Sequence, residues 1–141
     1  FFQAEDGIRD RLRSRGLGAG VEWILSQGVE ALHEKETALT RLFYEKIVHA
    51  SGVKIYGSFD ETDRAPIVSL NFGDEDAARA ADILWEDYGI CVRAGAHCAP
   101  LIHKALGTVE QGMVRFSFSH QNTEAEVLRA AEAVCELAEE G

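Results

Sequence analysis

The chain has 141 residues, of which 46% are hydrophobic and 27% are charged, a length that predicts one domain large enough to bury a core. Its 24 acidic and 14 basic residues give a formal charge of -10, which would repel phosphate backbones and anionic lipid surfaces, so we expect no nucleic-acid partner. No segment approaches the roughly 18 to 20 continuous apolar residues of a membrane helix, so we expect no membrane partner.

The first 15 residues are considered apart from the domain. Residues 3–10, Gln-Ala-Glu-Asp-Gly-Ile-Arg-Asp, resemble one reading frame of an adaptor oligonucleotide used in sequencing libraries. Because such segments carry no information about a fold, we expect a non-native or disordered leader over residues 1–15 and a domain over residues 16–141. A genuine but loosely ordered terminus is the alternative.

The first half of the domain predicts helix followed by two strands. Apolar residues recur at helical spacing over residues 16–51, which indicates one long helix or two helices broken near Gly28. Such a helix either connects to a further domain or covers the surface of this one. Residues 53–57 and 66–72 have the pattern of strands, with a polar, acidic loop over residues 58–64 between them.

The next elements are a helix and two strands. Asp74 is placed to cap a helix that ends at Gly89. The predicted apolar stripe of this helix consists of Ala77, Ala81, Leu84, Trp85 and Tyr88. Residues 90–93 and 113–119 read as strands, and the loop between them contains a short helical turn that ends near Leu106.

The last element is a helix that begins at Asn122 or Thr123, where Thr123 and Glu126 have the spacing of a capping box. Its predicted buried face consists of Val127, Ala131, Val134, Leu137 and Ala138. The order of elements and their short connections predict an α+β fold: a small, mostly antiparallel sheet with helices on one face, preceded by the long helix.

The three cysteines, Cys91, Cys98 and Cys135, are odd in number and show no Cys-x-x-Cys spacing, and the sequence shows no cleavable signal peptide. We therefore expect no disulfide framework, no metal site and a reducing, cytoplasmic compartment.

Cys98 is the candidate nucleophile, because small, turn-forming residues flank it on both sides and should expose its thiol. His97 and Arg93 are close enough in sequence to accept a proton or to favour the thiolate of a group whose unperturbed pKa is about 8.5. The alternative is a small buried cysteine beside a hydrogen-bonded histidine.

A long motif covers residues 88–101, Tyr-Gly-Ile-Cys-Val-Arg-Ala-Gly-Ala-His-Cys-Ala-Pro-Leu. It resembles the Tyr-Gly-Ile-x-Val-Arg-x-Gly-x-His-Cys-Ala-x-Leu region of class V aminotransferases, which are pyridoxal-phosphate enzymes of fold type I, in the cysteine desulfurase and selenocysteine lyase branch. The likeness extends in the same order from about residue 17 to the end. It implies that this chain is a C-terminal fragment that forms the small domain of such an enzyme, with Ala96 and Cys91 as departures that leave the branch open.

The resemblance implies a role for each residue of the motif. Cys98 would attack the sulfur of L-cysteine and become a persulfide while alanine is released. Arg115 would hold the substrate α-carboxylate through two parallel charge-assisted hydrogen bonds, unless it forms only a surface salt bridge. Arg93 would be a second substrate-binding arginine, and His97 would orient the loop or tune the thiol.

The resemblance also implies pyridoxal 5'-phosphate as cofactor, bound through a lysine of the large domain that precedes this region in the family. The His103-Lys104 dipeptide has the look of that lysine and its neighbour, but it follows the catalytic cysteine and so does not match in position. We expect that this chain contains no covalent anchor for the cofactor and is inactive alone. The partners implied for the full-length enzyme are L-cysteine, a sulfur-acceptor protein or thiol, and a second copy in a homodimer.

Three other functions remain open from the sequence. The chain could belong to a selenocysteine lyase or another class V lyase. It could instead be a non-catalytic binding or adaptor domain in which Cys98 is structural, or a redox or sulfur-carrier domain in which Cys98 reacts without a cofactor.

Overall fold

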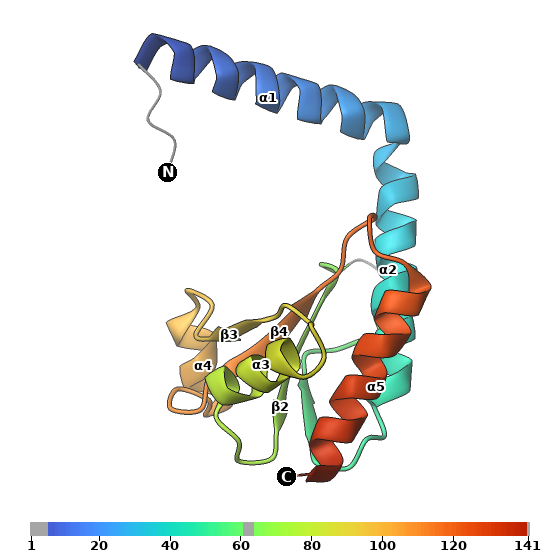
Figure 1. Cartoon of the computed structure of the whole chain (residues 1–141), viewed down its shortest axis with the longest axis vertical. Coiled ribbons are helices and arrows are strands. Elements are labelled where there is room, and N and C mark those ends of the chain that lie inside the picture. The colour runs from blue at the N-terminus through green and yellow to red at the C-terminus, as the bar shows by residue number, and fades with distance from the viewer. Residues whose placement is uncertain (1–5, 61–63, 141) are drawn as a thin grey trace. The chain divides into compact units, whose positions relative to one another are not determined.

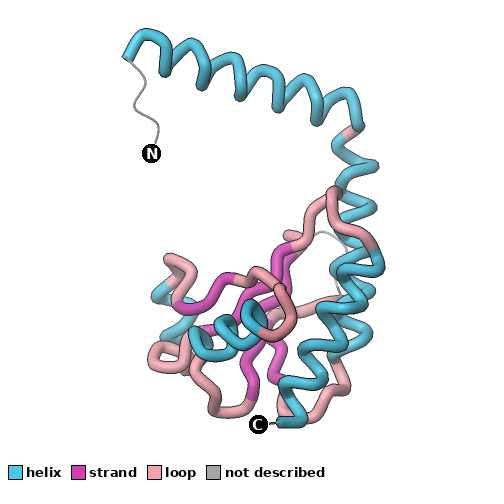
Figure 2. The backbone as a smooth tube through the Cα atoms, in the orientation of Figure 1, coloured by secondary structure: helices cyan, strands magenta, loops and turns pink. Residues whose placement is uncertain are grey.

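The computed structural model describes residues 6–60 and 64–140, with side chains described over residues 16–60 and 64–139. The elements in chain order are α1 (Asp6–Gln27), α2 (Val29–Ile47), β1 (Val53–Tyr56), β2 (Ile67–Phe72), α3 (Ala77–Glu86), β3 (Arg93–Gly95), α4 (Pro100–Leu106), β4 (Met113–Ser117) and α5 (Glu124–Glu140) (Figures 1 and 2). The chain divides between Lys35 and Glu36 into two compact units. Of the predicted leader, residues 1–5 and the side chains of residues 6–15 lie outside the described part, as do residues 61–63 of the predicted acidic loop.

Of the two arrangements that the sequence left open, one long helix or two, the structure has two helices that meet at Gly28. Gly28 has a φ of 83°, a left-handed conformation that a glycine adopts without strain. Its N–H still bonds to the carbonyl of Ile24 at 3.1 Å, and its carbonyl accepts from Leu32 at 3.1 Å, so one helix ends where the next begins. Leu17 and Leu25 of α1 are exposed by 73% and 68%, and no helix in residues 6–60 or 64–140 is long and apolar enough to cross a membrane.

The four strands form one antiparallel sheet in the order β1-β2-β4-β3. Residues opposite each other on neighbouring strands share a face of the sheet. Ile55, Leu70, Val114 and Ala94 form one such row, and all four belong to the hydrophobic core or pack against it. This face is therefore the inner face of the sheet.

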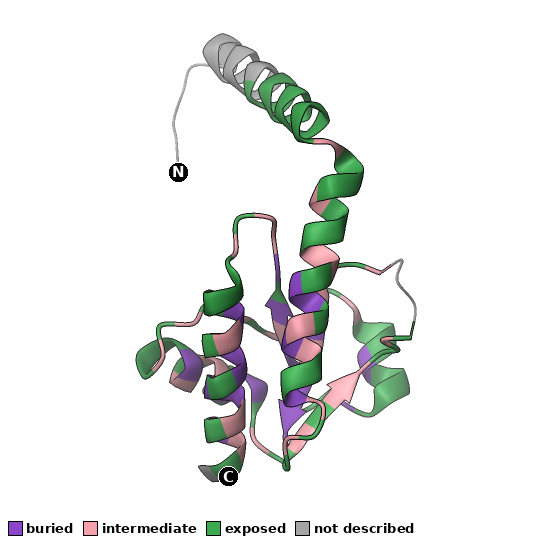
Figure 3. Ribbon diagram, turned by 90° about the vertical axis from the view of Figure 1, so that its right-hand side faces the viewer, coloured by how far each residue is buried: buried purple, intermediate pink, exposed green. Residues whose placement is uncertain are grey.

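Helices α2, α3 and α5 supply the other side of that core. Phe43 of α2, Leu84 of α3 and Val134 of α5 are completely buried in one cluster with Leu70 and Val114. Figure 3 shows the buried residues gathered between the sheet and these helices. The expected α+β fold, with a small antiparallel sheet and helices on one face, is confirmed for these elements.

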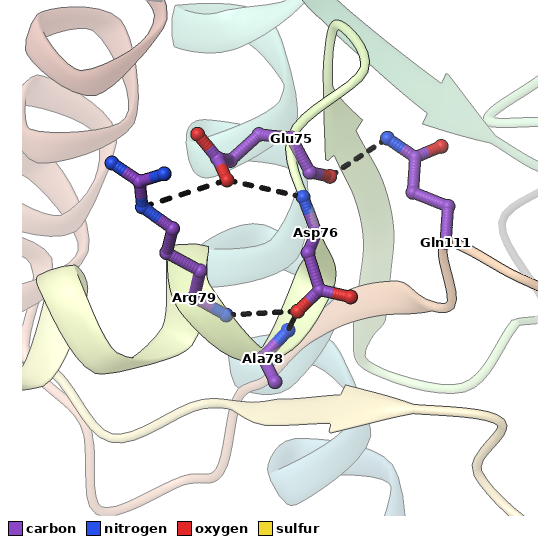
Figure 4. A network of polar contacts seen from close by, with 5 residues as sticks. All are labelled: Glu75, Asp76, Ala78, Arg79 and Gln111. Atoms are coloured by element: carbon purple, nitrogen blue, oxygen red, sulfur yellow. Dashed lines mark hydrogen bonds and ion pairs between the residues drawn. The ribbon is translucent and has the colours of Figure 1, made fainter.

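The cap of α3 differs from the prediction. Asp76, rather than Asp74, is the N-cap, and its Oδ1 accepts from the N–H groups of Ala78 and Arg79 at 2.9 and 3.1 Å (Figure 4). Gln111 reaches the same turn and donates from Nε2 to the carbonyl of Glu75 at 2.8 Å. The extended backbone of Asp76 suits a cap, which spacing alone does not reveal.

The predicted apolar stripe of α3 is partly wrong. Trp85 is 59% exposed, whereas Ala80, which was not predicted, is 1% exposed. Because the helix starts at Ala77, the face that meets the core runs through Ala77, Ala80 and Leu84. Trp85 lies beside this face.

The later elements also shift from their predicted bounds. The third strand is Arg93–Gly95 and not residues 90–93, and β4 ends at Ser117. The helical turn before Leu106 is confirmed as α4. The capping box of α5 is confirmed, because the carboxylate of Glu126 accepts from Thr123 N–H at 2.8 Å and Thr123 Oγ1 accepts from Glu126 N–H at 3.3 Å.

Candidate functional site

A row of polar side chains crosses the outer face of the sheet. Tyr56 pairs with Ser69, Ser69 with Arg115, and Arg115 with Arg93. The row lies on the face opposite the Leu70–Val114 row, because successive residues of a strand alternate between faces. It brings together the two arginines that the sequence singled out, and adds Tyr56 and Ser69, which the sequence analysis did not.

The guanidinium of Arg115 contains a buried nitrogen without a partner in the part of the chain that the structure describes. Nε of Arg115 is buried and has no hydrogen-bond partner among the described residues. Directly across from it lies Arg93, and two like charges on opposite residues of neighbouring strands destabilise a sheet. A bound carboxylate would satisfy the donors and offset the repulsion. The alternative of a surface salt bridge finds no support, since no ion pair of Arg115 is present in the described part of the chain.

Cys98 lies in a tight loop directly after β3. Its residue is exposed, which contradicts the alternative of a buried structural cysteine. His97 and Cys98 have φ angles of 52° and 60°, both left-handed, and the N–H of Ala99 closes the turn onto the carbonyl of Ala96 at 2.9 Å. Left-handed residues other than glycine are uncommon and cluster at functional sites.

This loop brings the thiol to an arginine. Nη2 of Arg93 donates to Sγ of Cys98 at 3.6 Å, so the guanidinium and the thiol are in direct contact. Arg93 therefore stands between two groups, with Arg115 across the sheet on one side and the thiol on the other. The structure brings the predicted nucleophile and both predicted arginines into one cluster.

His97 completes the cluster as a neutral ring. Its Nε2 donates to the carbonyl of Arg93 at 2.9 Å, which leaves Nδ1 as the acceptor nitrogen. Burial is the main cause that lowers the pKa of His97 from its ordinary value of 6.5, and electrostatic interactions with Arg115, Arg93 and His103 lower it further. The carbonyl of Arg93 opposes this shift. A neutral imidazole beside Cys98 can accept a proton.

His103 and Lys104 differ in burial, and Lys104 does not fit the lysine that binds the cofactor in the family. His103 is 2% exposed and its Nδ1 meets Oγ1 of Thr108 at 2.9 Å, whereas Lys104 is exposed on α4. The described residues contain no group of three or more metal-ligating side chains. The ring of His103 lies against that of His97, with centroids 5.9 Å apart, and this contact was not predicted. The sequence pointed to it only in that His103 lies one helical turn after Ala99, close to the loop.

Two cavities of several hundred cubic ångströms are lined by residues other than Cys98. One of about 400 Å³ is lined by Tyr88, Cys91, Phe118 and Arg129, and one of about 600 Å³ by Phe72, Arg79 and Leu137. Cys98 lines neither. Cys91 is exposed, and Cys135 is half-buried with a pKa raised by burial and by the neighbouring acidic side chains of α5.

The motif region and most of the fold match known proteins. Residues 11–129 match the model of the family described as Aminotransferase class-V. The chain is 34% identical over 115 residues to a probable cysteine desulfurase of Halobacterium salinarum, and 35% identical over 129 residues to a cysteine desulfurase of Serratia proteamaculans. These alignments cover 82% and 91% of this chain, but only 27% and 30% of the relatives.

Solved structures give the same result. The apo structure of a cysteine desulfurase from Thermococcus onnurineus superimposes with a TM-score of 0.82 at 32% identity, over 89% of this chain and 30% of that one. The cysteine desulfurase CsdA of Escherichia coli superimposes with a TM-score of 0.75 at 26% identity, over 89% and 29%. The chain therefore spans less than a third of the length of the proteins it resembles.

Proposed function

Because this chain belongs to the aminotransferase class-V family, we propose that it supplies the sulfur-accepting part of a pyridoxal-phosphate-dependent cysteine desulfurase, with Cys98 as the nucleophile. The observation that carries the proposal is the exposed thiol of Cys98, 3.6 Å from the guanidinium of Arg93. The matching cysteine desulfurases support the reaction class. Residues 16–141 are the proposed extent of the domain.

The proposed step transfers one sulfur atom. The thiolate of Cys98 attacks the sulfur of L-cysteine, so that a sulfur–sulfur bond forms and the bond between sulfur and the β-carbon breaks. The β-carbon takes up a proton and leaves as alanine, while Cys98 carries the persulfide. In this proposal Nδ1 of His97, which the bond from Nε2 leaves without a proton, takes the proton of the thiol, and the guanidinium of Arg93 lies 3.6 Å from the sulfur.

Arg115 binds the substrate in this proposal. Its unpartnered Nε and the like charge of Arg93 opposite it favour a carboxylate between the two side chains. Such a clamp would present the sulfur atom of the substrate to Cys98, which lies next to Arg93. Positioning of this kind lowers a barrier because the reacting atoms are already close.

The cofactor is proposed to be pyridoxal 5'-phosphate, which accepts the electron pair left on carbon when the carbon–sulfur bond breaks. The lysines described in this structure do not fit its covalent anchor, since all of them are exposed, including Lys104 on α4. We propose that residues outside this sequence hold the cofactor. A sulfur-acceptor thiol or protein and a second copy of the enzyme are the further partners proposed.

The test uses the product of the complete gene, supplied with pyridoxal phosphate and L-cysteine. We expect a persulfide on the Cys98 peptide by mass spectrometry and release of alanine, both abolished by Cys98→Ala. Cys91→Ala is the matched control, because Cys91 is equally an exposed thiol but lies outside the arginine cluster, and it should retain both signals. Full persulfide and alanine formation in Cys98→Ala would disprove the proposal, and turnover of L-selenocysteine alone would assign the other branch.

Arg115→Ala separates binding from sulfur chemistry in the same enzyme. Loss of the carboxylate clamp should lower kcat/KM for L-cysteine by roughly 10- to 100-fold, in line with one lost charge-assisted pair. Arg79→Ala is the control, because Arg79 is exposed, pairs with Glu75 and belongs to α3, which packs on the inner face of the sheet. An unchanged kcat/KM in Arg115→Ala would remove Arg115 from the proposal.

A further inference from the structure

His103 is a buried polar residue that the proposed sulfur chemistry does not use. It is 2% exposed, and a buried imidazole costs free energy unless its nitrogens are hydrogen-bonded. Nδ1 of His103 lies 2.9 Å from Oγ1 and 3.2 Å from the carbonyl oxygen of Thr108, which is itself 3% exposed. The ring of His103 also lies against that of His97, with centroids 5.9 Å apart. His103 and Thr108 are thus hydrogen-bonded to each other beside the loop that carries Cys98.

The backbone of His103 connects the same two segments. Its N–H donates to the carbonyl of Ala99, the residue after Cys98, at 3.3 Å. Its carbonyl accepts from the N–H of Thr108 at 2.9 Å. His103 therefore joins the end of the loop to the turn at Thr108 through both main chain and side chain.

The Thr108 turn supports the start of the loop as well. The carbonyl of Thr108 accepts from Gly112 N–H at 2.9 Å, and the carbonyl of Gly112 accepts from Nδ2 of the buried Asn71 at 2.9 Å. Gly112 packs so tightly on Gly95 that a Cβ on Gly112 would lie 2.9 Å from the Cα of Gly95. Gly95 is the last residue of β3, directly before the loop.

We propose that His103 is a positioning residue for Cys98: with Thr108 it fixes both ends of the loop over residues 96–99 and keeps the thiol at the guanidinium of Arg93. The inference rests on the proposed role of Cys98 as nucleophile. Two successive left-handed residues, His97 and Cys98, are unfavourable by themselves, so contacts around them must maintain that conformation.

The test measures how fast Cys98 is alkylated by iodoacetamide at neutral pH, by mass spectrometry of its peptide in this chain. Cys91, also exposed, is the internal reference in every sample. We expect the Cys98-to-Cys91 rate ratio to fall about threefold or more in Thr108→Val and His103→Leu, because the loop then no longer holds the thiol at the guanidinium of Arg93, the contact proposed to make Cys98 reactive. Thr108→Ser retains the hydroxyl and should restore the wild-type ratio.

Thr40→Val is the matched control for the loss of a buried hydroxyl. Thr40 is 2% exposed and donates to the carbonyl of Glu36 at 2.7 Å within α2. This variant should lower the Tm yet leave the alkylation ratio unchanged. A wild-type ratio in Thr108→Val, or a Thr108→Ser that behaves like Thr108→Val, would overturn the role of His103. Neither result touches the proposed function, which depends on persulfide formation in the complete gene product and fails only if Cys98→Ala retains it.

Discussion

His97 combines an unusual backbone with a perturbed side chain. Its left-handed φ of 52° turns the chain sharply before Cys98, and its Nε2 bonds to the carbonyl of Arg93, so the ring folds back over the strand that it has just left. There it is partly shielded from water and faces the charges of Arg93 and Arg115. The same geometry that presents the thiol therefore keeps the imidazole neutral.

This lowered pKa predicts a pH dependence of stability. Between 6.5 and the lower pKa of the folded state, the unfolded chain binds more protons at His97 than the folded chain does. The contribution of His97 to the free energy of unfolding is thus fully present above pH 6.5 and is lost as the pH falls through the folded-state pKa. We expect the Tm to drop less between pH 7.5 and 5.5 in His97→Gln than in wild type, measured by circular dichroism.

An exposed histidine provides the comparison for this pH dependence. His49 is exposed after α2, and His49→Gln should show the same Tm difference between the two pH values as wild type. Equal Tm differences in His97→Gln and wild type would show that desolvation of His97 does not affect stability.

The sequence predicted part of this site. Flanking small residues correctly predicted that Cys98 is exposed, because that is a local property. The left-handed backbone and the contact with Arg93 depend on where the turn at Thr108 and Gly112 packs, and no local pattern encodes that. Ser69 was missed for the same reason, since it joins the row only through strand pairing with Arg115, which lies 46 residues later in the sequence.

At the scale of elements, the start of α3 depends on one carboxylate. Asp76 accepts two backbone N–H groups there, whereas Asp74, two residues earlier, accepts none in the described hydrogen bonds. Asp76→Ala should lower the free energy of unfolding by about 1 kcal/mol, the usual effect of losing an N-cap. Asp74→Ala is the matched control and should change it little, as measured by urea denaturation. A larger loss for Asp74→Ala would restore the sequence-based assignment of the cap.

The contact between β3 and the turn before β4 is a second element-level test. A Cβ at Gly112 would meet the Cα of Gly95 at 2.9 Å and the Cβ of Ala77 at 3.3 Å, whereas a Cβ at Gly89 would meet nothing within 4 Å. The two glycines have φ angles of 71° and 66°, so alanine strains the backbone equally at both. Gly112→Ala should therefore lower the free energy of unfolding by roughly 1 to 3 kcal/mol more than Gly89→Ala, the cost of overpacking. If urea denaturation gave the same loss of unfolding free energy for both variants, the chain around Gly112 would accommodate the added methyl group without loss of stability.

These elements also show why sequence patterns fix helices better than short strands. The capping box at Thr123 and Glu126 is a local arrangement and was predicted correctly. The third strand was misplaced by three residues because the apolar run over 90–93 resembles a strand, while the ladder to β4 begins only at Arg93. Strand limits depend on the partner strand, which the pattern does not contain.

In the domain as a whole, the two faces of the sheet differ in character. The inner face and helices α2, α3 and α5 share one apolar core, while the outer face carries the row from Tyr56 to Arg93. Two arginines elsewhere in the domain have partners: Arg79 pairs with Glu75, and Arg129 donates to the carbonyl of Tyr88 at 3.0 Å. In a chain with a formal charge of -10, Arg93 and Arg115 lie opposite each other without an ion-pair partner among the described residues, and this is where the proposed substrate carboxylate would bind.

The exposed positions of the lysines predict how this chain behaves alone with pyridoxal phosphate. Its lysines stand in exposed positions, including Lys104 on α4, Lys46 at the end of α2 and Lys54 on β1, and α4 ends in a turn occupied by the His103–Thr108 contact. A lysine that holds the cofactor requires a shaped site for the phosphate and the ring. Borohydride reduction of this chain with pyridoxal phosphate should therefore label Lys104 no more than Lys46 and Lys54, as read by peptide mass spectrometry.

The complete gene product is the control for that labelling experiment. Its cofactor should be fixed to one lysine outside these 141 residues, and addition of L-cysteine should yield alanine, whereas this chain alone should yield none. Preferential labelling of Lys104 in the isolated chain, together with alanine release, would contradict this prediction. It would mean that the outer face of this sheet holds both the sulfur-accepting thiol and the cofactor that activates the substrate.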